Sequence, residues 1–288
     1  MQRFRIGAIT DEFSQDLVVA VGAMRELGMK GAELRMIGGR NIMDLTDSEI
    51  DSAVAILRDN GLQVVSIASP LLKCTMPKAP ELDARFEHLR FASDHKWDDQ
   101  PQLADRAFEI ALRTGAKIVR VFSCWRVVRP EEVFERVVDS LQDLSDRAEK
   151  HGLIIGLENE PSCNIATAQE TASILAAIDH PNLQLVWDPA NAYISGENPF
   201  PGGYKLLDTS RVAHVHAKDC TLEDHKPVWE PLGEGDLDWQ GQIDALAEDG
   251  YEGFIHLDTH WEGPGGDRLE GSRICTRNLR KLIEATAL

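Results

Sequence analysis

The chain has 288 residues, of which 43% are hydrophobic and 27% charged, so it is long enough for one large core and too apolar for a disordered protein. The formal net charge of -18 argues against nucleic acid as a partner, because binding to phosphate backbones needs a basic surface. The five cysteines are scattered and form no C-x-x-C pair, as expected for reduced thiols. The sequence shows no signal peptide and no apolar run of 18 residues. These features predict a cytoplasmic protein outside the membrane.

Eight short apolar runs alternate with longer amphipathic stretches along the whole chain. The strands are expected at Phe4–Ile9, Gly31–Leu34, Gln63–Ala68, Ile118–Phe122, Leu153–Glu158, Leu183–Trp187, Val212–His216 and Gly253–Leu257. The helices are expected near residues 15–28, 46–60, 101–115, 131–150, 167–179, 201–208, 239–249 and 268–286. Glycine follows several of these helices directly, as it does at many helix ends.

The repeated order of helix, glycine and apolar strand is typical of α/β proteins. Eight such units predict a (β/α)8 TIM barrel that forms a single domain over residues 1–288. A doubly wound dinucleotide-binding sheet is the alternative, but it needs a G-x-G-x-x-G turn after its first strand. This chain has Thr10, Asp11 and Glu12 there, so the barrel is favoured.

Two of the predicted connections that follow strands are long. They cover residues 69–100, after the third strand, and residues 219–238, after the seventh. In a parallel barrel these connections lie at the end where the strands finish, and that end carries the active site. Both segments are therefore expected to shape or cover a site.

Four of the predicted strands end in a side chain that can bind a metal, namely Glu158, Asp188, His216 and Asp258. The carboxyl ends of all strands of a parallel barrel meet at one mouth, so these four side chains can converge there. Carboxylates with one histidine form a hard, oxygen-rich site for a divalent cation. A surface role for Glu158 stays open on this spacing, and Glu160 has the same side-chain parity and is the rival ligand.

The seventh strand is the segment richest in chemical groups. His214 and His216 are two residues apart and therefore face the same side of the strand. His216 lies nearer the mouth and is the expected ligand, whereas His214 would support it from inside the barrel. Lys218 follows at the strand exit and is either a surface lysine or a cation of the site. His256 has the same parity as Asp258, and it is expected to be a buried structural histidine.

The segments LENEP (157–161), WDPANA (187–192), HVHAKD (214–219) and HLDTH (256–260) together resemble the xylose isomerase-like TIM-barrel superfamily. This superfamily includes sugar phosphate isomerases/epimerases and the AP endonuclease family 2 type. The specific part of the resemblance runs from about residue 153 to 260. The length and strand order resemble those of the superfamily over the whole chain.

The resemblance implies a metal site and assigns its ligands. In that family a Glu after the fifth strand, an Asp after the sixth, a His after the seventh and a Glu after the eighth hold the metal. Glu158, Asp188, His216 and Asp258 match these positions. The implied cofactor is a divalent ion, Mn²⁺ first, with Mg²⁺, Co²⁺ or Zn²⁺ as alternatives. Glu33 matches another recurrent family position at the mouth.

Two departures from the family pattern concern chemistry. The fourth ligand is Asp258, one methylene shorter than the usual Glu, and in the epimerases the two glutamates are also the acid–base pair. The ketose 3-epimerases carry a histidine three residues after the Asp ligand and an arginine six residues after the His ligand. This chain has Asn191 and Leu222 at those positions. A free ketohexose is therefore not the expected substrate.

The leading hypothesis is a metal-dependent isomerase or epimerase of a sugar or keto-sugar that acts through a metal-stabilised enediolate. Glu158 would remove the proton, Asp258 or a metal-bound water would return it, and Lys218 would hold developing oxyanion charge. The other residues expected to contact substrate are Glu33, Trp125, Asn191, His214, Trp229 and His260.

Three other functions stay open. A lyase or dehydratase would use the same site and the same first step, and then expel a leaving group. A nuclease like endonuclease IV needs more histidines and a surface for DNA, which the net charge of -18 disfavours. A barrel that only binds its ligand would also fit the altered fourth position. The expected partner is a small carbohydrate, and a homodimer is possible for this group of barrels.

Overall fold

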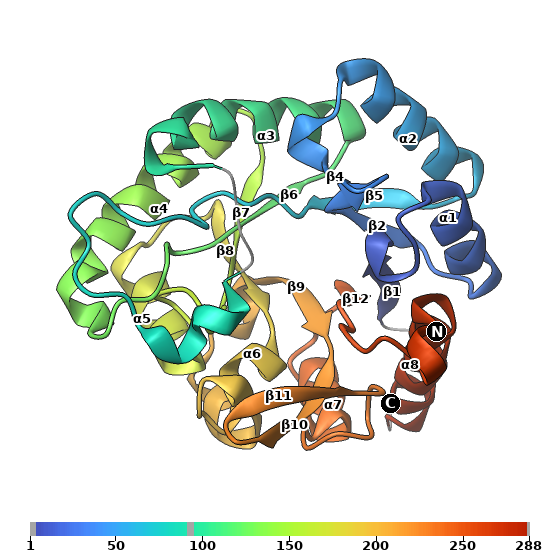
Figure 1. The fold of residues 1–288 in the computed structure, drawn as a ribbon. Helices are drawn as coiled ribbons and strands as arrows, with labels where there is room; N and C mark the ends of the chain where they lie inside the picture. The colour runs from blue at the N-terminus through green and yellow to red at the C-terminus, as the bar shows by residue number, and fades with distance from the viewer. Residues whose placement is uncertain (1–3, 91–94, 287–288) are drawn as a thin grey trace.

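The computed structural model describes residues 4–90 and 95–286, and its centre is a closed barrel of eight parallel strands (Figure 1). The barrel strands are β1 (Arg5–Ile9), β2 (Gly31–Leu34), β5 (Gln63–Ile67), β6 (Ile118–Val121), β7 (Ile154–Glu158), β8 (Leu183–Trp187), β9 (Val212–Ala217) and β12 (Phe254–Leu257). Around the barrel they follow the order β1-β12-β9-β8-β7-β6-β5-β2. The predicted TIM barrel is confirmed, and each strand boundary agrees with its prediction to within one residue.

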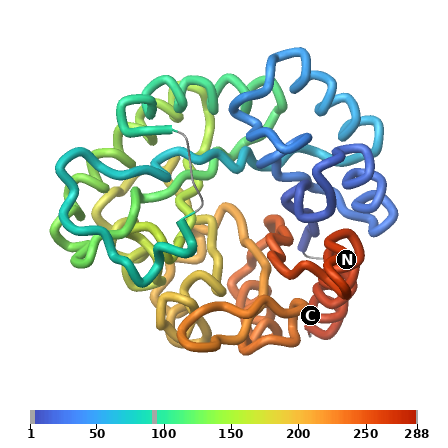
Figure 2. Tube along the Cα trace, in the orientation of Figure 1, coloured from blue at the N-terminus to red at the C-terminus, as the bar shows by residue number. Residues whose placement is uncertain are grey.

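Helices surround the barrel on its outside (Figure 1). They are α1 (Leu17–Glu26), α2 (Asp47–Asp59), α3 (Gln100–Thr114), α4 (Phe134–Glu149), α5 (Ala168–Ala177), α6 (Pro189–Ile194), α7 (Trp239–Glu248) and α8 (Arg268–Ala285). The chain runs once around the barrel, so that α8 returns beside α1 (Figure 2). Capping boxes start α2 at Thr46 and α5 at Thr167, where each threonine accepts a bond from the backbone N–H three residues on.

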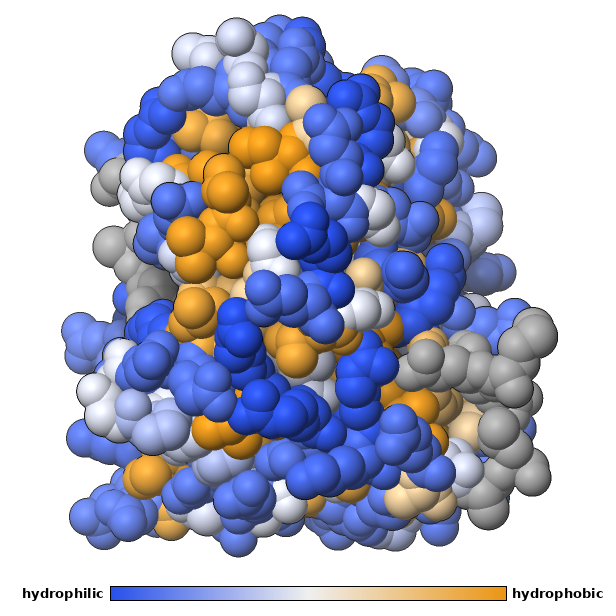
Figure 3. Space-filling view, turned by 90° about the vertical axis from the view of Figure 1, so that its right-hand side faces the viewer, coloured by the Kyte–Doolittle hydropathy of each residue, from blue (hydrophilic) through white to orange (hydrophobic). Residues whose placement is uncertain are grey.

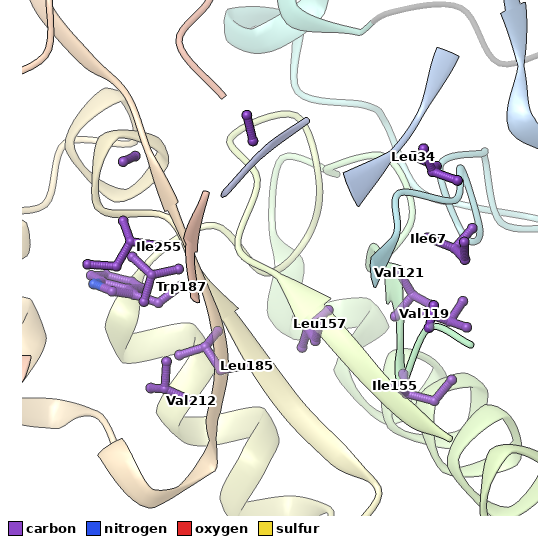
Figure 4. Packing of buried hydrophobic residues seen from close by; sticks show 14 of the residues in the cluster. Leu34, Ile67, Val119, Val121, Ile155, Leu157, Leu185, Trp187, Val212 and Ile255 are labelled. Atoms are coloured by element: carbon purple, nitrogen blue, oxygen red, sulfur yellow. The ribbon is translucent and has the colours of Figure 1, made fainter. Parts of the chain in front are cut away.

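Alternation along the strands separates two environments. Outward-facing side chains such as Val119, Leu157, Leu185 and Ile255 belong to the large core between the barrel and the helices (Figure 4). A smaller apolar cluster of Val65, Ile118 and Phe254 lies near the strand beginnings. Polar groups replace apolar ones toward the strand ends, and this leaves the mouth of the barrel for chemistry.

The predicted helix at residues 201–208 is wrong. The segment Pro199–Gly203 forms a single wide turn, and Tyr204–Leu206 forms a short 3-10 turn. Proline and glycine at 199, 201, 202 and 203 disfavour a regular helix, because proline lacks a donor and glycine gains little from helical order. A six-residue helix, α6, instead starts directly after β8.

The two long connections differ in structure. Residues 219–238 contain a two-stranded hairpin, β10 (Asp219–Glu223) with β11 (Lys226–Glu230), which was expected as a loop. Residues 69–100 contain 3-10 turns at Ala84–Leu89 and Trp97–Asp99, and positions 91–94 lie outside the described residues. A second small hairpin, β3 (Met36–Ile37) with β4 (Arg40–Asn41), follows β2.

The face that carries α1, α2 and α8 is mostly hydrophilic and has a hydrophobic area in its upper part (Figure 3). Val18 and Val19 of α1 are among the exposed large hydrophobic side chains of the described chain. Among the helices of residues 4–90 and 95–286, none has both the length and the hydropathy to cross a bilayer. The homodimer stays a prediction.

Candidate metal centre and active site

The four side chains predicted at the strand ends converge at the mouth of the barrel. Glu158 ends β7, Asp188 follows β8, His216 lies near the end of β9, and Asp258 follows β12. Each offers a ligand atom, and these atoms all lie within 4.8 Å of one another. All four side chains are buried. The barrel therefore gathers residues from four separate segments into a single donor set.

The donor set fits a divalent cation. Three carboxylates and one imidazole suit cations such as Mn²⁺, Mg²⁺ or Zn²⁺. Glu158 Oε2 and Asp188 Oδ2 are buried and have no hydrogen-bond partner among the residues that the structure describes. Each has a cation close by, Arg120 at 3.2 Å and Lys218 at 2.7 Å, so both oxygens carry negative charge that a bound cation could share.

Local structure positions Asp188 for this role. Pro189 follows it and starts α6, and the other carboxylate oxygen, Asp188 Oδ1, accepts a hydrogen bond of 2.9 Å from the Asn191 backbone N–H. Asn159 donates to the Asp188 carbonyl and accepts from its N–H. Because the helix cap uses Oδ1, Oδ2 remains directed to the centre. Burial raises the pKa of Asp188, although Lys218 opposes this shift.

Lys218 brings an ammonium group into the same centre. Its Nζ lies 2.7 Å from Asp188 Oδ2, without hydrogen-bond geometry, and donates to Asp258 Oδ2 at 3.0 Å. The side chain is almost fully buried. Burial alone would lower the pKa of Lys218, but Asp188 and Asp258 raise it well above its ordinary value, so the lysine is charged at neutral pH.

Glu158 is ionised in this environment. Burial disfavours its charge, but His216 and Arg120 outweigh that effect and lower the pKa of Glu158 to about 2. Arg120 Nη1 lies 3.2 Å from Glu158 Oε2, and His216 Nδ1 lies 3.2 Å from Oε1. Asn191 Nδ2 donates to Oε1 at 3.4 Å. A deprotonated carboxylate at this place can accept a proton at neutral pH.

A buried carboxylate orients the histidine ligand from below. Glu33 Oε2 lies 3.0 Å from His216 Nε2 and 2.8 Å from His214 Nε2. A hydrogen bond from Nε2 to Glu33 leaves Nδ1 directed to Glu158 and the other carboxylates, as in many carboxylate–histidine–metal sites. Burial opposes protonation of His216, but Glu33 and Glu158 raise its pKa well above the ordinary value. Binding of a cation through Nδ1 requires loss of that proton.

His256 fills the barrel axis beside this group. A Cβ added at Gly7 or Gly31 would lie 2.2 Å or 2.8 Å from His256 Nε2, so the two glycines leave the space for the ring. Burial lowers the pKa of His256 to about 3, and the ring is therefore neutral. This agrees with the structural role expected for His256.

Asp258 has cationic partners on both oxygens. Arg35 Nη1 donates to Oδ1 at 3.0 Å, Lys218 donates to Oδ2, and His260 Nε2 lies 3.3 Å from Oδ2. Burial would raise the pKa of Asp258, but Lys218 and His260 hold it well below the usual range. Arg35 also ion-pairs with Asp11 and Glu12, which follow β1. The Asp258 carboxylate is thus held by Arg35, which follows β2 and is itself held by the two acids that follow β1.

A cavity of about 660 Å³ opens above these groups. Its wall includes Glu158, Asn191, Lys218, Trp229, Asp258 and His260. The Trp229 ring from β11 stacks on His260 with centroids 4.8 Å apart, so the β10–β11 hairpin forms part of the wall. His260 has a φ of +55°, which is rare outside glycine, and its N–H bonds Glu12 Oε2 at 3.1 Å. Such a constrained residue is common at binding sites.

Three residues expected to contact substrate lie elsewhere. Glu33 and His214 are fully buried beneath His216 and do not line the cavity. Trp125 is also absent from the wall and lies behind Lys73, whose Nζ is 5.9 Å from the Trp125 ring centroid. The aromatic residue on that side of the cavity is Phe122.

Sequence reasoning missed the arginines of the cavity wall and Lys73. Arg120 was detectable, because it is a charged residue inside the apolar run of β6 and such a residue needs a specific partner. Arg35 follows β2 directly, which is also a mouth position. Lys73 lies in a long connection without a periodic pattern, and no sequence signal identified it.

The chain is similar in sequence to curated enzymes named after inososes. Inosose dehydratase of Lacticaseibacillus casei is 26% identical over 140 residues, which cover 43% of this chain and 46% of that protein. Inosose isomerase of Bacillus subtilis (strain 168) is 29% identical over 157 residues, which cover 52% and 51%. The matched part therefore spans about half the length of these curated relatives.

A solved structure supports the fold over the whole chain. The IolI protein, which was solved with a bound zinc atom, superposes with a TM-score of 0.74 at 17% identity and covers 99% of both chains. The family model of the xylose isomerase-like TIM barrel matches residues 21–280. The chain therefore belongs to the xylose isomerase-like TIM barrel family.

Proposed function

We propose that this protein is a divalent-metal-dependent isomerase or epimerase of a sugar or keto-polyol. One observation carries the proposal: Glu158, Asp188, His216 and Asp258 place their ligand atoms within 4.8 Å of one another beneath an open cavity. A bound divalent cation would supply polarisation of a substrate carbonyl and so make the adjacent C–H bond more acidic. The relatives named inosose isomerase and inosose dehydratase support this type of substrate.

The chain's own residues supply the proton transfers. Glu158 is ionised and faces the cavity, so it would take the proton from the carbon next to the substrate carbonyl. The electron pair of that C–H bond moves to the carbonyl oxygen, and the Lys218 ammonium would donate a hydrogen bond to the resulting charge. Return of a proton to another carbon, or to the opposite face, completes the isomerisation or epimerisation.

A dehydratase is the second candidate, and the surroundings of Asp258 favour it. Arg35 and Lys218 bond both oxygens of this carboxylate, so it is a poor second acid–base group. A dehydratase needs one base for the C–H proton and one donor for the leaving hydroxyl. Glu158 would be the base. The proton that Glu158 takes would then pass to the leaving hydroxyl, which releases water and leaves a carbon–carbon double bond between the two carbons.

Solvent exchange tests the proposal. The protein, purified with Mn²⁺, is incubated in D₂O with a set of ketoses, keto-sugars and inososes, and products are followed by mass and by NMR. We expect one deuterium at a carbon beside the carbonyl, with isomer formation for an isomerase or loss of one water for a dehydratase. A protein that binds Mn²⁺ but never exchanges a C–H with solvent would contradict the proposal.

A further inference from the structure

The charge of the cavity differs from that of the chain as a whole. The chain has 30 Lys and Arg residues against 48 Asp and Glu residues. Among the described residues of the cavity wall, by contrast, Lys and Arg outnumber Asp and Glu. Its cations are Arg35, Arg40, Lys73, Arg120, Lys218 and Arg268, and its carboxylates are Glu12, Asp44, Glu158, Glu160 and Asp258. Cations are therefore concentrated where substrate would bind, against a strongly acidic background.

Most of these cations already have close carboxylate partners. Arg35 bonds Asp11, Glu12 and Asp258, and Lys218 lies between Asp188 and Asp258. Arg40 and Arg268 pair with partly exposed glutamates of the rim, Glu49 and Glu262. The remaining two, Lys73 and Arg120, pair with Glu160 and Glu158 and in addition lie beside the same aromatic ring.

Lys73 and Arg120 share one aromatic ring. Lys73 Nζ lies 4.3 Å, and Arg120 Cζ 4.6 Å, from the centroid of Phe122, and all three side chains line the cavity. We name these three residues the cationic wall. The two charges are closer than the roughly 10 Å over which salt screens exposed charges, so they repel one another. An anion between them and the cavity would relieve that repulsion.

Arg120 uses few of its N–H donors in hydrogen bonds with the described residues. Its side chain is only 8% exposed, yet among the described residues it makes one hydrogen bond, from Nη2 to the Ser69 carbonyl at 3.3 Å. Its contact with Glu158 is an ion pair at 3.2 Å without hydrogen-bond geometry, and its Nε has no hydrogen-bond partner in the described chain. A guanidinium carries five N–H donors, so Arg120 is under-used for a nearly buried cation.

Lys73 is held beside this ring. Its ion pair with Glu160 is 3.8 Å long, and its side chain is mostly buried against Phe122. Glu158, the carboxylate nearest Arg120, also faces His216 and belongs to the proposed metal ligands. A cation bound to Glu158 would therefore leave less of that carboxylate's charge to balance Arg120.

We propose that the substrate carries an anionic group, a carboxylate or a phosphate, which binds at the cationic wall. This inference rests on the proposed function and names the substrate class within it. Oxyanions match the guanidinium and ammonium donors of Arg120 and Lys73, and bonds to charged partners are stronger than neutral ones. Because Arg120 contacts Glu158, an anion held there is adjacent to the base, and the Phe122 ring offers an apolar surface for the carbon skeleton.

Three probes that differ only at carbon 6 test this assignment. D-glucose, D-glucuronate and D-glucose 6-phosphate are titrated calorimetrically into the Mn²⁺-loaded protein, and again after removal of Mn²⁺. We expect one of the two anions to bind at least about tenfold more tightly than glucose. A preference for glucuronate identifies a carboxylate substrate, and a preference for glucose 6-phosphate identifies a phosphate.

Two variants locate the preference. Lys73→Gln removes one charge of the wall, and Arg120→Lys keeps the charge opposite Glu158 but removes the planar donor fork. Each is expected to lower the ratio of anion affinity to glucose affinity at least about fivefold. Lys205→Gln, at an exposed position outside the cavity, is the matched control and should leave that ratio unchanged. Circular dichroism confirms that the variants are folded.

Equal affinity for all three probes, or no binding of either anion at millimolar concentration, would overturn the inference. So would an anion preference that both wall variants leave unchanged. The proposed function fails separately. If the protein prefers an anion at the wall but binds no Mn²⁺, the metal-dependent function is wrong and the anion site stands. If it binds Mn²⁺ and exchanges a substrate C–H without an anion preference, only the anion site is wrong.

Discussion

Glu158→Gln is expected to lower the rate of substrate C–H exchange by at least about a hundredfold, because a positioned general base contributes roughly 10²–10⁴ in rate. The amide has nearly the same shape, but it cannot accept the proton. It also removes one negative charge from the ligand set, so a weaker affinity for Mn²⁺ is expected as well. The exchange rate is therefore measured at saturating Mn²⁺, which separates the loss of the base from the loss of the cation.

Glu252→Gln is the matched control for this variant. Glu252 is exposed and lies just before β12, at the opposite end of the barrel from Asp258. Its replacement should leave exchange at the wild-type rate. If Glu158→Gln retained more than about a tenth of the wild-type rate at saturating Mn²⁺, Glu158 would not be the base.

Lys218→Met should make folding depend on a divalent cation. In the metal-free protein the ammonium neutralises Asp188 and Asp258, and without it two buried carboxylates face one another. Removal of one partner from a buried charge group costs about 3 kcal/mol or more, so the free energy of unfolding should fall by that order. Mn²⁺ occupying the same carboxylates should restore most of the loss, because ligands that bind only the folded state stabilise it.

Urea unfolding with Mn²⁺ or with EDTA measures this effect. Lys205→Met, at an exposed position, is the control and should leave the free energy of unfolding unchanged under both conditions. We expect a larger stabilisation by Mn²⁺ in Lys218→Met than in wild type, since no ammonium competes for the carboxylates. A variant that unfolds like wild type in EDTA would show that Lys218 is not the counter-ion of these carboxylates.

The barrel could be predicted from the sequence because burial on both faces leaves each strand as an apolar run. Runs such as Leu183–Trp187 therefore stand out from their surroundings. The helix predicted at residues 201–208 was wrong, because the prolines and glycines of this segment prevent regular helical hydrogen bonding. The β10–β11 hairpin was not predicted, because its turn is formed by Asp224 and His225 with positive φ. Glycine or asparagine at these positions would have indicated a hairpin turn.

The convergence of Glu158, Asp188, His216 and Asp258 could be predicted because topology alone brings strand ends together. The direction in which a long side chain extends from its strand end could not be predicted. Lys218 was placed at the mouth, but no pattern shows that its ammonium lies between Asp188 and Asp258. Likewise, Glu33 was expected at the mouth, whereas its carboxylate lies below His216 and orients it. Contacts of this kind depend on the registry of neighbouring strands and on space left by residues such as Gly7 and Gly31.

Asp258 is where this chain departs most clearly from its family's pattern. Arg35 and Lys218 donate to its two oxygens, so this fourth position has two positive neighbours. This change favours chemistry with one base, Glu158, over a symmetric pair of acid–base groups.

The central claim is that four strand-end side chains hold one divalent cation, and a calorimetric titration of Mn²⁺ into the EDTA-treated protein tests it most directly. Wild type and Asp188→Asn are compared, because this substitution keeps the shape of the helix cap at α6 and removes one ligand charge. We expect one Mn²⁺ per chain in wild type and an affinity about a hundredfold weaker in the variant. No binding by the folded wild-type protein, or equal binding by both proteins, would contradict it.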